Sequence, residues 1–287
     1  MAEARIAVIG GSGLYQIEGL RDAEKLKPKT PFGLPSDVIT VGTLEGRRVA
    51  FLPRHGRGHR ISPTELPVPA NIYALKSLGV ELIISISAVG SLKEEIHPLD
   101  LVIPDQLIDR SRSRVNTFFG RGLVVHVTFA DPFCPVLSRI LYDAAQGVGA
   151  RVHRGGTYVV MEGPLFSTRA ESHLYRSWGA SVIGMTALPE AKLAREAEMC
   201  YATVACVTDY DCWHEEHESV TIDMVISNLT QNVDIAKRII TQAVIDIPLE
   251  RECGCDTALE NAIITAPERI PRRTKEDLAL LIGKYVS

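Results

Sequence analysis

Short apolar runs rich in β-branched residues recur along the chain and predict β-strands. Several of these runs are apolar at every position, which is typical of strands in a sheet that is covered on both faces. The predicted strands are Ile6–Ile9, Val49–Leu52, Leu82–Ser87, Leu101–Ile103, Val124–Val127, Tyr158–Met161, Val182–Met185 and Ala202–Val207.

Between the strands, apolar residues recur every three or four positions, which is the spacing of one helical face. The clearest stripes predict helices near residues 70–77, 136–148, 222–244 and 278–282. Strands that alternate with helices favour an α/β fold. After Pro248 the chain becomes polar and cysteine-containing, so we expect one domain over residues 1–248 and a C-terminal extension over 249–287 that packs on it.

The bulk composition narrows the class of protein. The chain has 287 residues, of which 46% are apolar and 23% charged, with a formal net charge of −4. The negative charge argues against nucleic acid or an anionic membrane as a partner. No apolar run approaches the ~20 residues of a membrane span, so we expect a cytoplasmic protein. The arginine-rich segment 109–114 is then interpreted as an exposed or intersubunit loop.

The first loop with unusual chemistry follows the first predicted strand, in the stretch AVIGGSGLY from Ala7 to Tyr15. Glycines let the backbone approach a ligand, and successive amides in such a turn suit an anion. The dinucleotide fingerprint requires a third glycine where Gln16 stands, and no lysine follows Gly13 as a P-loop requires. Two interpretations remain open from this segment: a phosphate site that includes Ser12, or a turn without a ligand.

Three further loops at strand ends carry groups that could bind a single phosphate. The stretch RHGRGH (54–59) offers arginine forks between glycines, and SISAVGS (85–91) offers hydroxyls before a glycine. Met185 and Thr186 follow another strand. Hydroxyls, amides and one Arg-His pair suffice for a phosphate dianion but not for a nucleic-acid track.

A fifth loop places Asp209 and Asp211 directly after a predicted strand. Carboxyl groups beside apolar neighbours keep a raised pKa and can donate a proton. A heterocycle with adjacent acceptor and amino groups would fit such a pair. Helix capping and a metal site are the alternatives, but the histidines of the adjacent HEEH stretch (214–217) are spaced i,i+3 rather than i,i+4.

Seven segments together resemble the trimer-type purine nucleoside phosphorylases, and within them the methylthioadenosine phosphorylases. The resemblance covers roughly residues 5–245 in one order. The segments are IGGSGL (9–14), RHGRGH (54–59), SAVGSL (87–92), ADPFCP (130–135), EGPLFSTRAES (162–172), GMT (184–186) and TDYDCW (208–213).

The resemblance implies a mixed central β-sheet with flanking helices and a pentosyltransferase activity. Inorganic phosphate would cleave the C1′–N9 bond of methylthioadenosine, which gives adenine and 5-methylthioribose 1-phosphate for purine and methionine salvage. Phosphate is then a co-substrate, and neither a cofactor nor a metal is expected.

The resemblance also implies roles for individual residues. Asp209 and Asp211 would face the purine and act as the catalytic groups. The implied phosphate ligands are Ser12, Arg54, His55, Ser87, Ala88 and Thr186; the implied sugar and base contacts are Met185, Phe166 and His126; the implied specificity positions are Ser167, Ile222 and Val225. His126 would come from a neighbouring subunit, so we expect a homo-oligomer, either a trimer or a hexamer.

The chain departs from its relatives at a few positions. Gly184 stands where some members have asparagine, whereas Ser12 and Ser87 replace threonines and keep the hydroxyl.

The type of base is predicted from Asp209, because a carboxylate accepts from a 6-amino group but opposes a 6-oxo group. A phosphorylase for adenosine or 6-oxopurine nucleosides, a nucleoside hydrolase and a non-enzymatic phosphate-binding module are the rival hypotheses.

The cysteines allow more than one interpretation. Zinc at the Cys253-Gly254-Cys255 stretch would require a second close pair or histidines at matching spacing, and neither accompanies it in the sequence. In thermophilic relatives, cysteines matching Cys134 and Cys200 form a disulfide and a Cys-x-Cys tail forms another. Both pairs, Cys134/Cys200 and Cys253/Cys255, could therefore be bonded here.

Overall fold

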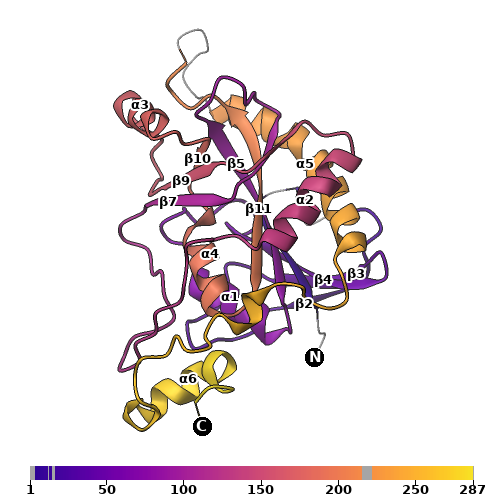
Figure 1. The fold of residues 1–287 in the computed structure, drawn as a ribbon. Helices are drawn as coiled ribbons and strands as arrows, with labels where there is room; N and C mark the ends of the chain where they lie inside the picture. Colours follow the sequence, from indigo (N-terminus) through magenta and orange to yellow (C-terminus); the bar gives the residue numbers. More distant parts are fainter. Residues whose placement is uncertain (1–3, 12, 15–16, 215–221, 287) are drawn as a thin grey trace.

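A computed structural model describes residues 4–11, 13–14, 17–214 and 222–286, and these build one mixed sheet with helices on both faces (Figure 1). The strands are β1 Ile6–Gly10, β2 Arg21–Leu26, β3 Ile39–Leu44, β4 Arg47–Pro53, β5 Leu82–Ser91, β6 Leu101–Ile103, β7 Gln106–Arg110, β8 Val152–Arg154, β9 Thr157–Met161, β10 Val182–Gly184 and β11 Cys200–Asp209. The helices are α1 Val68–Ser77, α2 Pro135–Gly147, α3 Arg169–Ser177, α4 Ala187–Glu196, α5 Ile222–Asp246 and α6 Arg272–Ile282, with short 3₁₀ turns at Gly254–Thr257 and Pro267–Arg269.

The order of the strands brings several loops to one edge of the sheet. The main path runs β2-β3-β4-β1-β5-β10-β9-β7, and β11 links β5 to β6, which pairs with β8. β1 lies parallel to β4 and β5, and β11 lies parallel to β5. Since parallel strands end on the same side, the loops after β1, β4, β5 and β11 meet at one edge.

Each face of the sheet is covered because its strands alternate apolar side chains between the two sides. In β1, Ile6 and Val8 pack in a cluster with α2 and α5, whereas Ala7 and Ile9 pack in a second cluster with α1 and α4. α2 and α5 contact each other on the first side (Figure 1). Burying one Leu or Ile side chain contributes about 1.5–3 kcal/mol, so these two layers hold the sheet and its loops in place.

The C-terminal residues pack against the second face. Leu278, Leu281 and Ile282 of α6 are buried in the same cluster as α1 and α4. Earlier in this segment, Cys255 belongs to the cluster of α2 and α5. The tail therefore runs from one side of the sheet to the other.

Most of the predicted elements are present, and the differences have physical causes. The predicted strand Val124–Val127 is wrong: only Val125 pairs, in an isolated bridge with Ile263. Four strands were missed. β2 is polar and exposed at a sheet edge, and β7 and β8 are short and only partly buried. β3 is mostly buried, but threonines and a glycine interrupt its apolar residues. Two helices, α3 and α4, were also missed. α3 is polar, although Thr168 and Glu171 form a capping box at its start. α4 is irregular near its start, where Leu188 has a non-helical conformation before Pro189.

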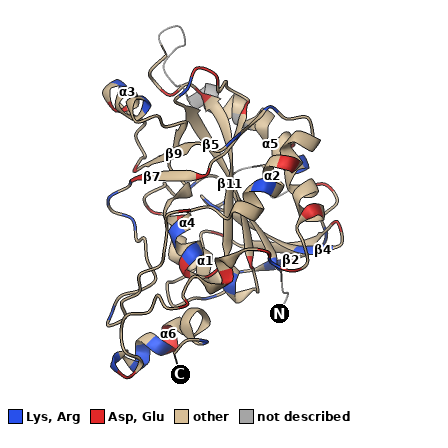
Figure 2. Cartoon of the chain, in the orientation of Figure 1, with Lys and Arg blue, Asp and Glu red and all other residues tan. Residues whose placement is uncertain are grey.

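Charge is distributed without a single dominant sign over the described chain. Basic and acidic residues are interspersed along the ribbon, including on α2 and α6 (Figure 2). None of the described helices combines the length and the apolar character that a membrane crossing requires.

Candidate active site

A cavity of about 550 Å³ opens at the edge where β1, β4, β5 and β11 end. Most of the residues predicted from the sequence line it, and they come from five separate segments of the chain. These residues are Arg54, His55, Ser87, Ala88, Phe166, Met185, Thr186, Asp209 and Asp211. Ser12 lies outside the described residues, as do the side chains of Ile222 and Val225 at the start of α5.

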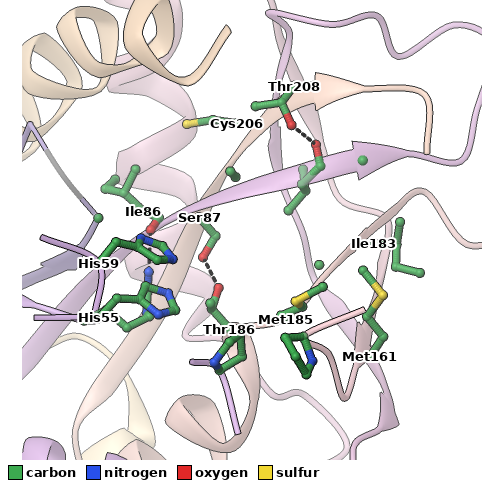
Figure 3. Close-up of a pocket in the computed structure, with 18 of the residues that line it drawn as sticks. His55, His59, Ile86, Ser87, Met161, Ile183, Met185, Thr186, Cys206 and Thr208 are labelled. Carbon is green, nitrogen blue, oxygen red and sulfur yellow. Dashed lines mark hydrogen bonds between the residues drawn. The ribbon is translucent and has the colours of Figure 1, made fainter. Parts of the chain in front are cut away.

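One end of the cavity presents hydroxyl groups. The Ser87 Oγ at the middle of β5 lies 2.8 Å from the Thr186 Oγ1 just before α4, so β5 and the start of α4 meet here (Figure 3). Ala88 and Gly11 line the same cavity. Two hydroxyls that share a hydrogen bond can rotate to donate to an oxyanion, as a phosphate site requires.

His55 stands at this end with a defined tautomer. Its Nδ1 lies 2.9 Å from the carbonyl oxygen of Ile61, so Nδ1 carries the proton when the ring is neutral. The ring stacks on His59 with centroids 4.3 Å apart (Figure 3). Burial, and then the positive charge of Arg54, lowers the pKa of His55 to about 4. The ring is therefore neutral near pH 7, with Nε2 available to a ligand.

Arg54 is buried and bonded on most of its donors. Its Nε and Nη2 bind both oxygens of Glu190 at 2.6 and 3.1 Å, and Nη2 also donates to Ser85 Oγ at 2.7 Å. Nη1 donates to the carbonyl of Ile86 at 2.8 Å. Burial alone would lower the pKa of Arg54, but the Glu190 carboxylate raises it, so the charge persists. Among the described residues, these bonds leave the second N–H of Nη1 for a ligand.

A second buried arginine braces the loops around the cavity. Arg114 donates from Nη1 to the carbonyls of Met185 and Leu188, and from Nη2 to the carbonyls of Met161 and Glu162. Only 3% of its side chain is exposed. Segment 109–114 was interpreted as an exposed or intersubunit loop, and exposure is wrong for Arg114, because its guanidinium is buried and donates to carbonyls near the ends of β9 and β10.

The other end of the cavity holds the two predicted carboxyl groups. Asp209 is 5% exposed; its Oδ2 accepts from Thr208 Oγ1 at 2.6 Å and its Oδ1 accepts from the Asp211 amide at 2.8 Å. Burial raises the pKa of Asp209 and also that of Asp211. Two fixed carboxyl groups with raised pKa values can share a proton with a base placed between them and the hydroxyl end.

Backbone features aim Asp209 into the cavity. A β-bulge at Thr208 interrupts the pairing of β11 with β5, since Val207 opposes Val89 but Asp209 opposes Gly90. A Cβ at Gly90 would lie 2.9 Å from Asp209 Oδ1, so only glycine fits there. Asn232 of α5 donates to the Val207 carbonyl at 3.2 Å and so holds the bulged strand end.

Apolar side chains close the walls between the two ends. Met161, Ile183 and Met185 lie together on one side (Figure 3). Phe166 also lines the cavity, and 48% of its surface is exposed. A Cβ at Gly184 would lie 2.4 Å from Tyr158 Oη, so the glycine leaves room for that buried tyrosine.

Two predicted residues do not line the cavity of their own chain. His126 is exposed on the segment beside Ala262, whose carbonyl accepts from its amide. Ser167 directs its Oγ to Met161 Sδ at 3.6 Å. Ser167 thus contacts a wall residue of the cavity rather than the cavity itself.

Sequence reasoning missed the residues that hold the site rather than line it. Glu190, Arg114 and Asn232 all act on groups far away in the chain. The sequence signals for these residues were weak. Glu190 is a single glutamate among the buried residues of α4, and Asn232 is a single polar residue beside the apolar stripe of α5.

Comparison with known proteins gives consistent matches over the whole chain. The family described as the phosphorylase superfamily matches residues 5–245. The S-methyl-5′-thioadenosine phosphorylase of Geobacter sulfurreducens is 61% identical over 285 residues, which covers 99% of this chain and 100% of that one. The protein of the same name from Koribacter versatilis is 57% identical, and the match covers 99% of this chain and 97% of that one.

Solved structures agree in fold along the chain. A methylthioadenosine phosphorylase from an antarctic soil metagenomic library has a TM-score of 0.94 at 53% identity, with 98% of this chain and 99% of that chain covered. The methylthioadenosine phosphorylase from Schistosoma mansoni, solved in complex with adenine, has a TM-score of 0.80 at 34% identity, with 98% of each chain covered.

Proposed function

The chain belongs to the phosphorylase superfamily, and from that membership we propose that it cleaves 5′-methylthioadenosine with inorganic phosphate. The products are adenine and 5-methylthioribose 1-phosphate. The observation that carries the proposal is the 61% identity to a methylthioadenosine phosphorylase over 99% of the chain, together with a cavity that has hydroxyls at one end and buried carboxyls at the other.

The carboxyl end would serve the leaving base. Adenine departs poorly as an anion, so a proton donated to the ring stabilises it as the C1′–N9 bond breaks. Asp209 has a raised pKa and both oxygens held in place, which suits a donor of this kind. Acid assistance is typically worth about 10²–10⁴-fold in rate. One oxygen accepts from the 6-amino group while the other donates, which favours adenine over 6-oxopurines.

The hydroxyl end would bind the phosphate. Ser87, Thr186 and the Ala88 amide supply donors, Arg54 supplies a positive charge beneath them, and Ser12 completes the set by family resemblance. A phosphate held below the sugar is both the nucleophile and a negative charge that stabilises the developing oxocarbenium ion. Met185 and Phe166 would contact the sugar and the base.

Neutral His55 offers only a lone pair at Nε2, so binding a phosphate dianion favours uptake of a proton by that ring. The shared proton then lies between Nε2 and a phosphate oxygen. We expect phosphate to bind more tightly below neutral pH for this reason.

The remaining features of the proposal follow from the family. The active unit is a homo-oligomer, a trimer or a hexamer, in which the exposed His126 reaches the site of a neighbour, and phosphate is the only small molecule needed besides the nucleoside. Ile222 and Val225 form the methylthio slot, and Ser167 adjusts specificity through Met161. Residues 1–248 form the phosphorylase domain with the segment 249–287 packed on it, and the protein works in the cytoplasm.

Product analysis tests the activity directly. Methylthioadenosine, adenosine and inosine are each incubated with the enzyme, with and without phosphate, and bases and sugars are separated by chromatography. We expect adenine and a sugar phosphate from methylthioadenosine only when phosphate is present. Free methylthioribose without phosphate would indicate a hydrolase, and faster turnover of inosine would indicate a 6-oxopurine phosphorylase.

A further inference from the structure

Four cysteines from three distant parts of the chain meet at one point, near the start of β11, whereas the active-site cavity lies around the end of that strand. Cys134 precedes α2, Cys200 begins β11, and Cys253 precedes the 3₁₀ turn Gly254–Thr257, in which Cys255 lies. All four sulfur atoms lie within 4.8 Å of one another. We call these four residues the thiol cluster.

We propose that the thiol cluster is a structural site for a single Zn²⁺ ion. In a tetrahedral zinc–thiolate centre with Zn–S bonds of about 2.3 Å, neighbouring sulfurs lie about 3.8 Å apart. The sulfur–sulfur distances in the thiol cluster are close to this value. The Cys200 and Cys253 sulfurs are 3.3 Å apart, and no two of the four sulfurs are more than 4.8 Å apart. Cavity and cluster share no residue, so the site is separate from the catalytic one.

The arrangement fits a mononuclear ion better than the other groups that thiols hold. Iron–sulfur clusters place several metal and sulfide atoms between their cysteines and hold the sulfurs farther apart. Two disulfides would sort the sulfurs into two pairs, whereas here each sulfur has all three others as neighbours, and all four cysteines are free. A disulfide across one residue, as between Cys253 and Cys255, is strained.

The surroundings can stabilise thiolates. Cys134 caps α2, and its sulfur accepts from the Leu137 amide at 3.5 Å at the positive end of a 13-residue helix. Arg5 and Arg251 border the same small cavity as three of the cysteines. A zinc ion with four thiolates carries two net negative charges, and these groups offset them.

Sequence spacing argued against zinc because no second close pair accompanies Cys253 and Cys255, and the fold supplies that pair. Cys134 is held against β11, since its amide donates to the Tyr201 carbonyl at 2.9 Å. Binding converts thiols to thiolates and releases their protons to solvent, with no change in oxidation state. The ion would tie the C-terminal segment to β11 and α2.

Metal analysis and thiol counting on the purified full-length enzyme test the proposal. We expect one zinc per chain, and six reactive thiols after denaturation with a chelator but without reductant. The Cys253→Ser/Cys255→Ser double variant loses two direct ligands. Its affinity for Zn²⁺ should therefore fall by more than the roughly 10–100-fold that follows the loss of an outer-sphere partner. The control is Cys212→Ser, which removes a half-buried thiol outside the cluster and should retain the metal.

A second measurement covers the case in which the double variant does not fold. Chelator-stripped, reduced wild-type protein is titrated with Co²⁺, whose absorption reports tetrahedral thiolate ligation, and then with Zn²⁺ to displace it. Two reactive thiols without reductant would mean that the cluster is oxidised to disulfides and would overturn the proposal. Six thiols with no uptake of either ion would overturn it equally.

Discussion

The substitution Asp209→Asn separates the chemical role of the carboxyl group from its structural role. The amide oxygen can still accept from the Asp211 amide, which lies 2.8 Å from Oδ1. The amide nitrogen would face Thr208, whose hydroxyl now donates to Oδ2 at 2.6 Å but also lies 3.2 Å from the Val89 carbonyl. The hydroxyl can therefore turn to Val89 and accept from the new amide, so the loop should keep its shape.

The expected loss in rate follows from the removal of the proton donor. The value of kcat/KM for methylthioadenosine should fall about 10²–10⁴-fold, which corresponds to about 2.7–5.4 kcal/mol of transition-state stabilisation. The amide N–H of asparagine can donate to a 6-oxo group, but it meets another donor at a 6-amino group. The carboxylate of aspartate accepts from the 6-amino group instead. The ratio of inosine to methylthioadenosine turnover should therefore rise.

Steady-state kinetics with both nucleosides at saturating phosphate measures these effects, and urea unfolding reports stability. Asp143→Asn, on an exposed position of α2, is the matched control and should change neither. A variant at Asp209 that folds normally and keeps both its rate and its base preference would refute the assignment of the acid.

Three further changes test the groups that surround the cavity. Glu190→Gln leaves the charge of Arg54 buried without its counterion, so the free energy of unfolding in urea should fall by about 3–5 kcal/mol; an unchanged value would show that the pair is dispensable. Arg114→Met frees the Met185 carbonyl and should lower kcat/KM for the nucleoside roughly 10–100-fold, with a smaller change in KM for phosphate, whereas equal effects on both would contradict a positioning role. The pKa of His55 is about 4 in the fold and about 6.5 unfolded, so the unfolded chain takes up a proton first and stability falls, by up to about 3 kcal/mol, as the pH drops from 6.5 to 4. His55→Gln should flatten this part of the pH profile in urea unfolding, and a profile like that of the wild type would assign the loss to other groups.

Local patterns predicted the parts of the site that are local in the chain. Glycines and hydroxyls directly after an apolar run marked the ends of β1, β5 and β10, because a strand end that binds a ligand needs both at once. The carboxyl pair after β11 was visible for the same reason. The order of strands in the sheet then brings these loops together, and that order is not written in any one segment.

Groups that act across the chain were not predictable in the same way. Arg54 and Glu190 are separated by 136 positions, and nothing near either residue indicates the other. Arg114 looked like one of several exposed arginines, because burial of a guanidinium depends on carbonyls that β9 and β10 deliver. The thiol cluster escaped for the same reason, since Cys134 and Cys200 become neighbours of the tail only after folding.

The bulge at Thr208 has a consequence for how this enzyme tolerates change in length. Side chains alternate between the two faces of a sheet along a strand. A strand that is one residue shorter therefore turns its last side chain toward the other face. β11 runs buried for ten residues from Cys200 to Asp209, and its phase is set once, by pairing with β5. Deleting any one residue of this strand would turn Asp209 away from the purine base or move Cys200 out of the thiol cluster. The residues of β11 can therefore be substituted, but their number cannot change, whereas the surface loops can lengthen.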